Sequence, residues 1–132
     1  MSTEYFLDTN VLVYAVSGDA RRADRSEELL VGGATISVQV LNETALTLRR
    51  RFSATWPKIA DISRRVRKAC KVLPLTEAIH ESGLSIAARH RLDVYDSMLV
   101  AAALTAGGKT LYSEGMHDGS RIEGLTIRNP YA

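Results

Sequence analysis

The sequence has few cysteines and no long hydrophobic run, and each shortage excludes a class of protein. Its only cysteine, Cys70, cannot form an internal disulfide or supply a cysteine-based zinc site, which favours a reducing compartment. The longest apolar run, Met98 to Leu104, is far shorter than the roughly 20 residues that span a bilayer. No basic segment followed by an apolar one opens the chain, so we expect no signal peptide. These features predict a cytoplasmic protein that does not associate with a membrane.

Several common enzyme motifs are also missing. The sequence has no GxxxxGK phosphate loop, which argues against a nucleotide triphosphatase. His80, His90 and His117 lack the HExxH spacing of zinc hydrolases. The segment from Asp8 to Asn10 lacks the second acid of the Asp-x-Asp motif found in haloacid dehalogenase-type phosphatases. The sequence therefore does not support assignment to any of these three enzyme classes.

The pattern of apolar residues predicts one α/β domain covering residues 1–132. Hydrophobic residues make up 45% of the chain and charged residues 24%, as in ordinary globular domains. Short apolar runs alternate with segments of helical periodicity, which predicts a three-layer α/β/α sandwich with a mostly parallel central sheet flanked by helices. Between the last two predicted strands, residues 114–124 read as a polar loop. We expect strands at 4–7, 34–36, 72–75, 109–113 and 125–128, and helices at 10–16, 20–31, 38–51, about 56–69, 76–91 and 94–106.

Positive charge is concentrated in the middle of the chain, although the net charge is only +2. Between Arg49 and Lys71 nine basic residues accompany a single acid, Asp61. Such a block suits a polyanion or an acidic partner protein. A solvated, arginine-rich helix face explains it equally well.

Five acids fall at the end of a predicted strand or early in the helix that follows it. Right-handed crossovers bring these positions to one edge of a parallel sheet, where ligands bind in open α/β folds. Carboxylates gathered there repel one another unless a cation lies between them, and hard oxygen ligands suit Mg²⁺ or Mn²⁺. The candidates are Asp8, Glu43, Asp96, Glu114 and Asp118.

Each acid also has a purely structural explanation. Asp8 could simply cap the following helix, and Asp96 could be a first-turn acid favoured by the helix dipole, with Asp93 as the cap. Glu43 points away from the apolar stripe that we assign to its helix, which predicts a solvated glutamate. That stripe consists of Val38, Leu41, Ala45, Leu48 and Phe52.

Four segments, in order, resemble the motifs of PIN-domain nucleases. Phe6-Leu7-Asp8-Thr9-Asn10-Val11-Leu12 resembles the first motif, and Ser37-Val38-Gln39-Val40-Leu41-Asn42-Glu43 the second. Tyr95-Asp96-Ser97-Met98-Leu99-Val100-Ala101-Ala102 resembles the third. Leu111-Tyr112-Ser113-Glu114, Asp118-Gly119 and the stretch from Leu125 to Pro130 resemble the C-terminal end of VapC-type toxins.

The resemblance implies a ribonuclease that hydrolyses RNA phosphodiester bonds with Mg²⁺ or Mn²⁺. It also implies the toxin half of a type II toxin–antitoxin pair, a homodimer neutralised by a small antitoxin. Asp8, Glu43 and Asp96 become the first three active-site acids. The supporting polar groups become Asn10, Ser97 and Ser113, and the arginines expected to hold RNA phosphates are Arg49, Arg50, Arg64 and Arg65.

One position departs from the family pattern. Relatives commonly read Ser/Thr-x-Asp after the fourth strand, whereas this chain reads Ser113-Glu114-Gly115. Glu114 or Asp118 could supply the missing carboxylate. If neither does, the chain is a catalytically weak or inactive PIN-like protein that binds RNA or an antitoxin. An antitoxin segment is expected along residues 38–66, where Trp56 is either a core residue or part of that interface.

Overall fold

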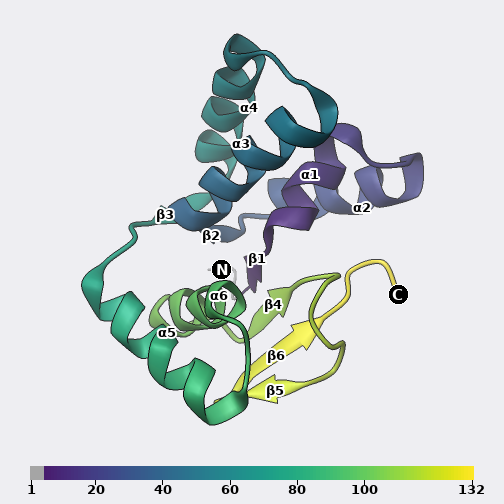
Figure 1. Cartoon of the computed structure of the whole chain (residues 1–132). Coiled ribbons are helices and arrows are strands. Elements are labelled where there is room, and N and C mark those ends of the chain that lie inside the picture. The colour runs from purple at the N-terminus through teal and green to yellow at the C-terminus, as the bar shows by residue number, and fades with distance from the viewer. Residues whose placement is uncertain (1–4) are drawn as a thin grey trace.

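The computed structural model describes residues 5–132, and these residues form six strands and six helices (Figure 1). In chain order the elements are β1 (Tyr5–Leu7), α1 (Thr9–Ser17), α2 (Ala20–Val31), β2 (Thr35–Ser37), α3 (Val38–Phe52), α4 (Trp56–Ala69), β3 (Lys71–Leu73), α5 (Glu77–His90), α6 (Val94–Thr105), β4 (Thr110–Tyr112), β5 (Arg121–Ile122) and β6 (Leu125–Arg128). The strand order in the sheet is β3-β2-β1-β4-β6-β5. All neighbouring strands are parallel except β5 and β6, so the predicted fold class is confirmed.

Two groups of helices flank the sheet (Figure 1). α6 packs on β2, β4 and β6, and α5 packs on α6. α6 is apolar almost all round and is buried from Ser97 to Ala103, as a helix between a sheet and a second helix must be. α1 to α4 pack against one another as the second group. No helix within residues 5–132 is long and apolar enough to cross a membrane.

The helices begin where the sequence places a short polar side chain. Each capping oxygen accepts a hydrogen bond from a backbone N–H of the first turn, which satisfies a donor that the helix itself leaves unpaired. α4, for example, is capped by Thr55, whose side chain accepts from the N–H of Lys58. The capping residues are Asp8, Asp19, Ser37, Thr55, Thr76 and Asp93.

The predicted polar loop at 114–124 contains the strand β5, and on this point the prediction is wrong. β5 forms a hairpin with β6, with Arg121 opposite Thr126. The two linking residues, Glu123 and Gly124, have φ values of 52° and 93°. Positive φ at both central positions is the geometry of tight hairpin turns. A strand of two residues is too short to show alternation, so the pattern did not reveal it. Of the predicted strand 4–7, Glu4 lies outside the described residues.

The buried face of α3 also differs from the predicted stripe. Val40, Thr44 and Leu48 are buried, while Phe52 is 45% exposed. The true stripe includes a threonine, whose hydroxyl donates to the carbonyl of Val40 at 2.7 Å and is thereby satisfied inside the core. Because the prediction counted only apolar residues, it misplaced the buried face of α3 around the helix axis. For the same reason it predicted the wrong direction for the Glu43 side chain.

Candidate functional site

A cleft of about 270 Å³ opens at the edge of the sheet where β1 ends. Residues of α1, α3 and α6 form its walls together with Asp8, which directly follows β1. The cleft contains three of the predicted acids and therefore brings together positions 88 residues apart in the chain. Its lining residues are Asp8, Thr9, Asn10, Val13, Tyr14, Glu43, Thr47, Arg51 and Asp96.

Asp8 lies at the base of this cleft and is only 8% exposed. Its Oδ1 accepts from the N–H of Thr9 at 2.6 Å, and its Oδ2 accepts from the hydroxyl of Ser113 at 2.7 Å. Burial raises the pKa of Asp8, although these two hydrogen bonds act in the opposite direction. Asp8 therefore caps α1 and at the same time lines the cleft, so its role as a helix cap does not remove its carboxylate from the candidate site.

Glu43 is half-buried and faces the cleft, contrary to the prediction that it is solvated. The hydroxyl of Thr9 donates to its Oε1 at 3.3 Å, and Nε2 of Gln39 donates to its Oε2 at 2.8 Å. The same Gln39 nitrogen donates to the carbonyl of Tyr95 at 3.1 Å. Because its partners come from α1 and α3, and Gln39 in turn reaches α6, the Glu43 carboxylate has a fixed place at the junction of the three helices.

Asp96 also has a perturbed pKa. Its pKa is raised from 3.8 to about 6, first by burial and then by the negative charges of Asp93, Asp8 and Glu43. The cap of α6 is Asp93, whose Oδ1 accepts from the N–H of Asp96 at 2.8 Å. The predicted capping arrangement is therefore present, and it leaves the Asp96 side chain on the cleft. Burial is thus the main cause of the raised pKa, and the neighbouring negative charges add to it.

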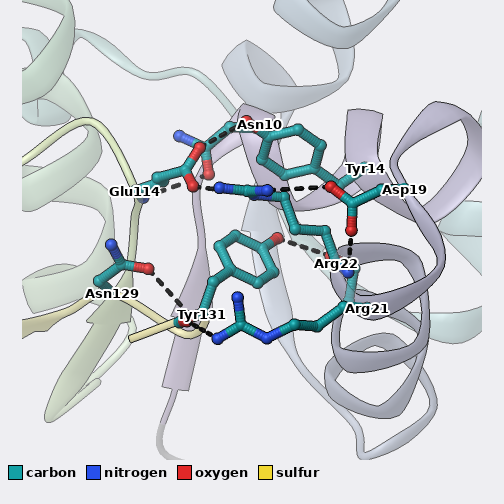
Figure 2. Close-up of polar contacts among 9 residues, drawn as sticks. Asn10, Tyr14, Asp19, Arg21, Arg22, Glu114, Asn129 and Tyr131 are labelled. Atoms are coloured by element: carbon teal, nitrogen blue, oxygen red, sulfur yellow. Dashed lines mark hydrogen bonds and ion pairs between the residues drawn. The ribbon is translucent and has the colours of Figure 1, made fainter.

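Neither candidate for the fourth acid lines this cleft. Figure 2 shows that the Glu114 carboxylate is directed toward Tyr14 and Arg22. The Tyr14 hydroxyl donates to Oε1 at 2.5 Å, and Nε of Arg22 donates to Oε2 at 3.1 Å. Asp118 is exposed, and its Oδ1 accepts from the N–H of Asn129 at 2.8 Å. Both carboxylates thus have structural partners elsewhere.

The Arg22 guanidinium is the centre of the contacts around Glu114 (Figure 2). It also pairs with Asp19 at 2.9 Å. Its Cζ lies 5.3 Å from the ring centroid of Tyr14 and 5.6 Å from that of Tyr131. Arg22 therefore joins α1, α2 and the C-terminal segment to the loop after β4.

The three predicted supporting groups lie close to the acids in different ways. Ser113 holds Asp8 and also accepts from the N–H of Met116 at 3.3 Å, and Oδ1 of Asn10 accepts from the N–H of Glu114 at 3.3 Å. The hydroxyl of Ser97 is buried and has no hydrogen-bond partner within residues 5–132. An unpaired buried hydroxyl beside an acid is a group that a bound water or ligand would satisfy.

Comparison with known proteins gives a family assignment. The sequence profile of the PIN domain family matches residues 5–116. The chain belongs to the PIN domain family. A comparison with curated protein sequences finds no match.

Solved structures with the same fold cover almost the whole PIN domain described here. A toxin–antitoxin complex from Klebsiella pneumoniae matches with a TM-score of 0.73 at 18% identity, covering 96% of this chain and 98% of the other. DNA-bound VapBC from Salmonella typhimurium has a TM-score of 0.72 at 19% identity, with coverage of 98% and 99%. Mycobacterium tuberculosis VapC20, described as a Sarcin-Ricin loop cleaving toxin, has a TM-score of 0.67 at 23% identity, with coverage of 88% and 91%. At these identities the likeness concerns the fold.

The acids of this PIN domain fit a small hard cation by their chemistry. All donors are oxygens, which Mg²⁺ and Mn²⁺ prefer. Within residues 5–132, no three histidine, cysteine, aspartate or glutamate side chains are arranged closely enough to enclose a metal by themselves. Mg²⁺ does not need such a cage, because it usually keeps several waters and binds through one or two carboxylates. Asp8 and Asp96, which line the same cleft, are the carboxylates that would hold such an ion.

Three of the four arginines that we predicted to hold RNA phosphates have partners within the protein. Arg64 and Arg65 both pair with Asp61, at 3.0 and 3.2 Å. Arg49 donates to the carbonyl of Ala54, and its Cζ lies 4.8 Å from the ring centroid of Trp56. Trp56 is 61% exposed, so its interpretation as a core residue is wrong.

None of the four arginines selected from the sequence lines the acidic cleft; Arg51 does. The signal that would have identified it is its spacing from Glu43. Glu43, Thr47 and Arg51 are four residues apart and therefore share one face of α3.

Proposed function

We propose that this PIN domain is a metal-dependent endoribonuclease that acts as the toxin of a toxin–antitoxin pair. The observation that carries the proposal is the meeting of Asp8, Glu43 and Asp96 in one cleft, with the pKa of Asp96 raised to about 6 by burial and by its acidic neighbours. Such a group of carboxylates is costly for a folded protein unless it serves to bind a cation.

Each residue has a distinct part in the proposed reaction. Asp8 and Asp96 would hold Mg²⁺ or Mn²⁺, and the bound cation would activate water and offset charge on the phosphoryl oxygens. Glu43 accepts a hydrogen bond from the attacking water and orients it toward phosphorus. Ser113 and the N–H of Thr9 keep the Asp8 carboxylate in position, as outer hydrogen bonds do for metal ligands.

Cleavage of a synthetic RNA tests the proposal. We expect cleavage with Mg²⁺ or Mn²⁺, none with EDTA, and none with Asp8→Asn or Asp96→Asn. Asparagine is as good a helix cap as aspartate, so Asp8→Asn should retain the fold of α1. Asp24→Asn, on the exposed side of α2, is the matched control and should cleave normally. Full activity in either cleft variant would remove the basis for the assignment.

The antitoxin is proposed to cover an apolar groove that shares no lining residue with the acidic cleft. This groove has a volume of about 620 Å³ and is formed by α1, α2, α3 and α4. Val31, Val16 and Phe52 line it and are 75%, 47% and 45% exposed, which is unusual for large apolar side chains. Two basic residues, Lys58 and Arg65, and one acid, Glu27, also line it, so an amphipathic segment with a mainly acidic polar face is the partner that fits.

The antitoxin proposal predicts that a small protein is encoded beside this gene, and that protein is the probe for the test. Val31→Glu places a negative charge in the groove and should abolish complex formation, measured by calorimetry with the two purified proteins. Leu84→Glu on α5 is the control, because Leu84 is similarly apolar and 46% exposed but lies outside the groove. Equal loss in both variants would show that the groove is not the contact surface.

A homodimer is proposed through the second apolar surface, at the start of α6. Tyr95, Val94 and Leu75 are 68%, 48% and 51% exposed there and border a cavity of about 560 Å³. Tyr95→Glu should convert the dimer to a monomer in light scattering. A wild-type protein that is monomeric at micromolar concentration would contradict this assignment.

Gly115 favours a second candidate function, namely a PIN domain that binds RNA or antitoxin with little catalysis. No acid stands at this position, and neither neighbouring carboxylate lines the cleft. Purified protein that binds RNA but does not cut it with any divalent cation would support this candidate against the nuclease.

A further inference from the structure

One basic side chain, Arg51, lines the acidic cleft together with the three carboxylates. It belongs to the last turn of α3, and Thr47 separates it from Glu43 by one helical turn on each side. The wall of the cleft formed by α3 therefore carries a carboxylate at one end, a hydroxyl in the middle and a guanidinium at the other end. A strand of RNA lying along this wall would meet all three groups.

The Arg51 guanidinium pairs with no carboxylate in the described part of the chain. Within residues 5–132 it forms no ion pair, whereas Arg64 and Arg65 share Asp61, and Arg22 pairs with Glu114. Its Cζ lies 5.8 Å from the ring centroid of Phe52, the next residue, which is a cation–π distance that leaves the N–H donors available.

The positive charge of Arg51 on α3 acts on Tyr14, which belongs to the wall of the cleft formed by α1. The pKa of Tyr14 on α1 is raised, chiefly by its hydrogen bond to Glu114, and Arg51 is among the positive groups that act in the opposite direction. Arg51 on α3 and Tyr14 on α1 line the same cleft, which places the basic side chain at the site itself. Carboxylates alone would repel a polyanion, so an unpaired cation at this place supplies the attraction that the substrate needs.

We propose that Arg51 binds an RNA phosphate adjacent to the scissile one and thereby positions the strand across the three acids. A guanidinium suits this task because its planar N–H groups make two parallel hydrogen bonds to phosphate oxygens. The inference rests on the proposed nuclease function and names its substrate-binding residue. Arg51 contacts the substrate but transfers no proton.

Binding of a short fluorescent single-stranded RNA in EDTA tests Arg51 without any cleavage. We expect Arg51→Gln to weaken binding by about tenfold or more, as loss of a charge-assisted contact does. The slope of log K against log salt should fall by about 0.7, which corresponds to one lost phosphate contact on a single strand. Arg67→Gln is the control, since it removes the same charge from the exposed side of α4 and should leave the slope unchanged.

Two further measurements separate a phosphate contact from other roles. Arg51→Lys should restore part of the affinity, because charge is kept while the paired hydrogen bonds are lost. Replacing single linkages of the RNA by neutral methylphosphonates should reveal one position at which Arg51→Gln causes no additional loss.

Three results would overturn the proposal. Equal effects of Arg51→Gln and Arg67→Gln would indicate general attraction of charge. An unchanged salt slope combined with altered Mn²⁺ affinity would make Arg51 a counter-ion of the acids. A methylphosphonate scan without any matching position would show that Arg51 contacts no single phosphate. Because these assays involve no cleavage, a protein that fails to cut RNA would refute the nuclease and still permit the test of Arg51.

Discussion

Replacing Asp96 by asparagine should stabilise the metal-free protein while abolishing its activity. In the native cleft the pKa of this carboxyl is about 6, against 3.8 for an unperturbed aspartate. The difference of 6 − 3.8, about 2.2, corresponds to a ceiling of about 3 kcal/mol at 1.36 kcal/mol per pKa unit. Because the side chain is partly exposed, solvent screening reduces the expected gain to about 1–2 kcal/mol.

The dependence on pH follows from the direction of the shift. Since the native pKa lies above the unfolded one, the native state binds more protons between pH 4 and 6, and its stability falls as pH rises through that window. Asparagine resembles the protonated acid and avoids this loss. The advantage of Asp96→Asn should therefore be complete near pH 7.5 and should have largely disappeared near pH 4.

Urea unfolding in EDTA at pH 7.5 and pH 4 measures the effect. Asp24→Asn, which removes an exposed carboxylate of α2, should change the free energy of unfolding little at either pH. Saturating Mg²⁺ should stabilise the wild type and leave Asp96→Asn almost unaffected, because ligand binding stabilises only the form that binds it. A destabilised variant at pH 7.5, or a gain that persists at pH 4, would refute the electrostatic explanation.

Three other substitutions test the neighbourhood of the acids. Ser113→Ala removes the hydroxyl that donates to Asp8 and should lower metal affinity or activity about 10- to 100-fold, measured by Mn²⁺ titration and RNA cleavage; unchanged values would contradict its positioning role. Gly115→Asp should raise Mg²⁺ affinity by adding a carboxylate. The position has room for it, since an added Cβ would meet only Asn10 Nδ2, at 3.9 Å. Gly115→Asn is the neutral control, and an equal gain in both variants would show that the added charge is not the cause. Glu114→Gln should retain cleavage while losing about 0.5–1 kcal/mol of stability through its pairing with Arg22, so loss of cleavage in a folded variant would instead make Glu114 a metal ligand.

Sequence patterns were sufficient for features that depend on a local capping residue or on the handedness of the connections between parallel strands. A short polar residue caps each helix, and Asp93, the cap expected for the helix that carries Asp96, is the cap of α6. The order of strands and helices placed Asp8 and Asp96 at one edge of the sheet, because parallel connections leave little choice. These features depend on local chemistry and on handedness, both of which a single sequence records.

The remaining features depend on contacts between distant segments. The direction of Glu43 was missed because a buried threonine, Thr44, belongs to the core face of α3. The engagement of Glu114 by Arg22 joins residues 92 positions apart, and no local pattern announces such a pair. Arg51 was missed because it is one of nine basic residues in the middle of the chain, and its spacing from Glu43 identifies it only once Glu43 is known to face the cleft.

The packing of Tyr131 makes one wall of the cleft depend on a side chain that lies outside the cleft. Tyr131 is buried, its hydroxyl bonds to Ser26 at 2.6 Å, and its ring packs edge-on against Tyr14, the partner of Glu114. Replacing Tyr131 by alanine would leave Tyr14 and Ser26 without this neighbour. The three acids would all remain, yet the wall that Tyr14 forms would lose its support, so the rate of cleavage should depend on a residue that does not line the cleft.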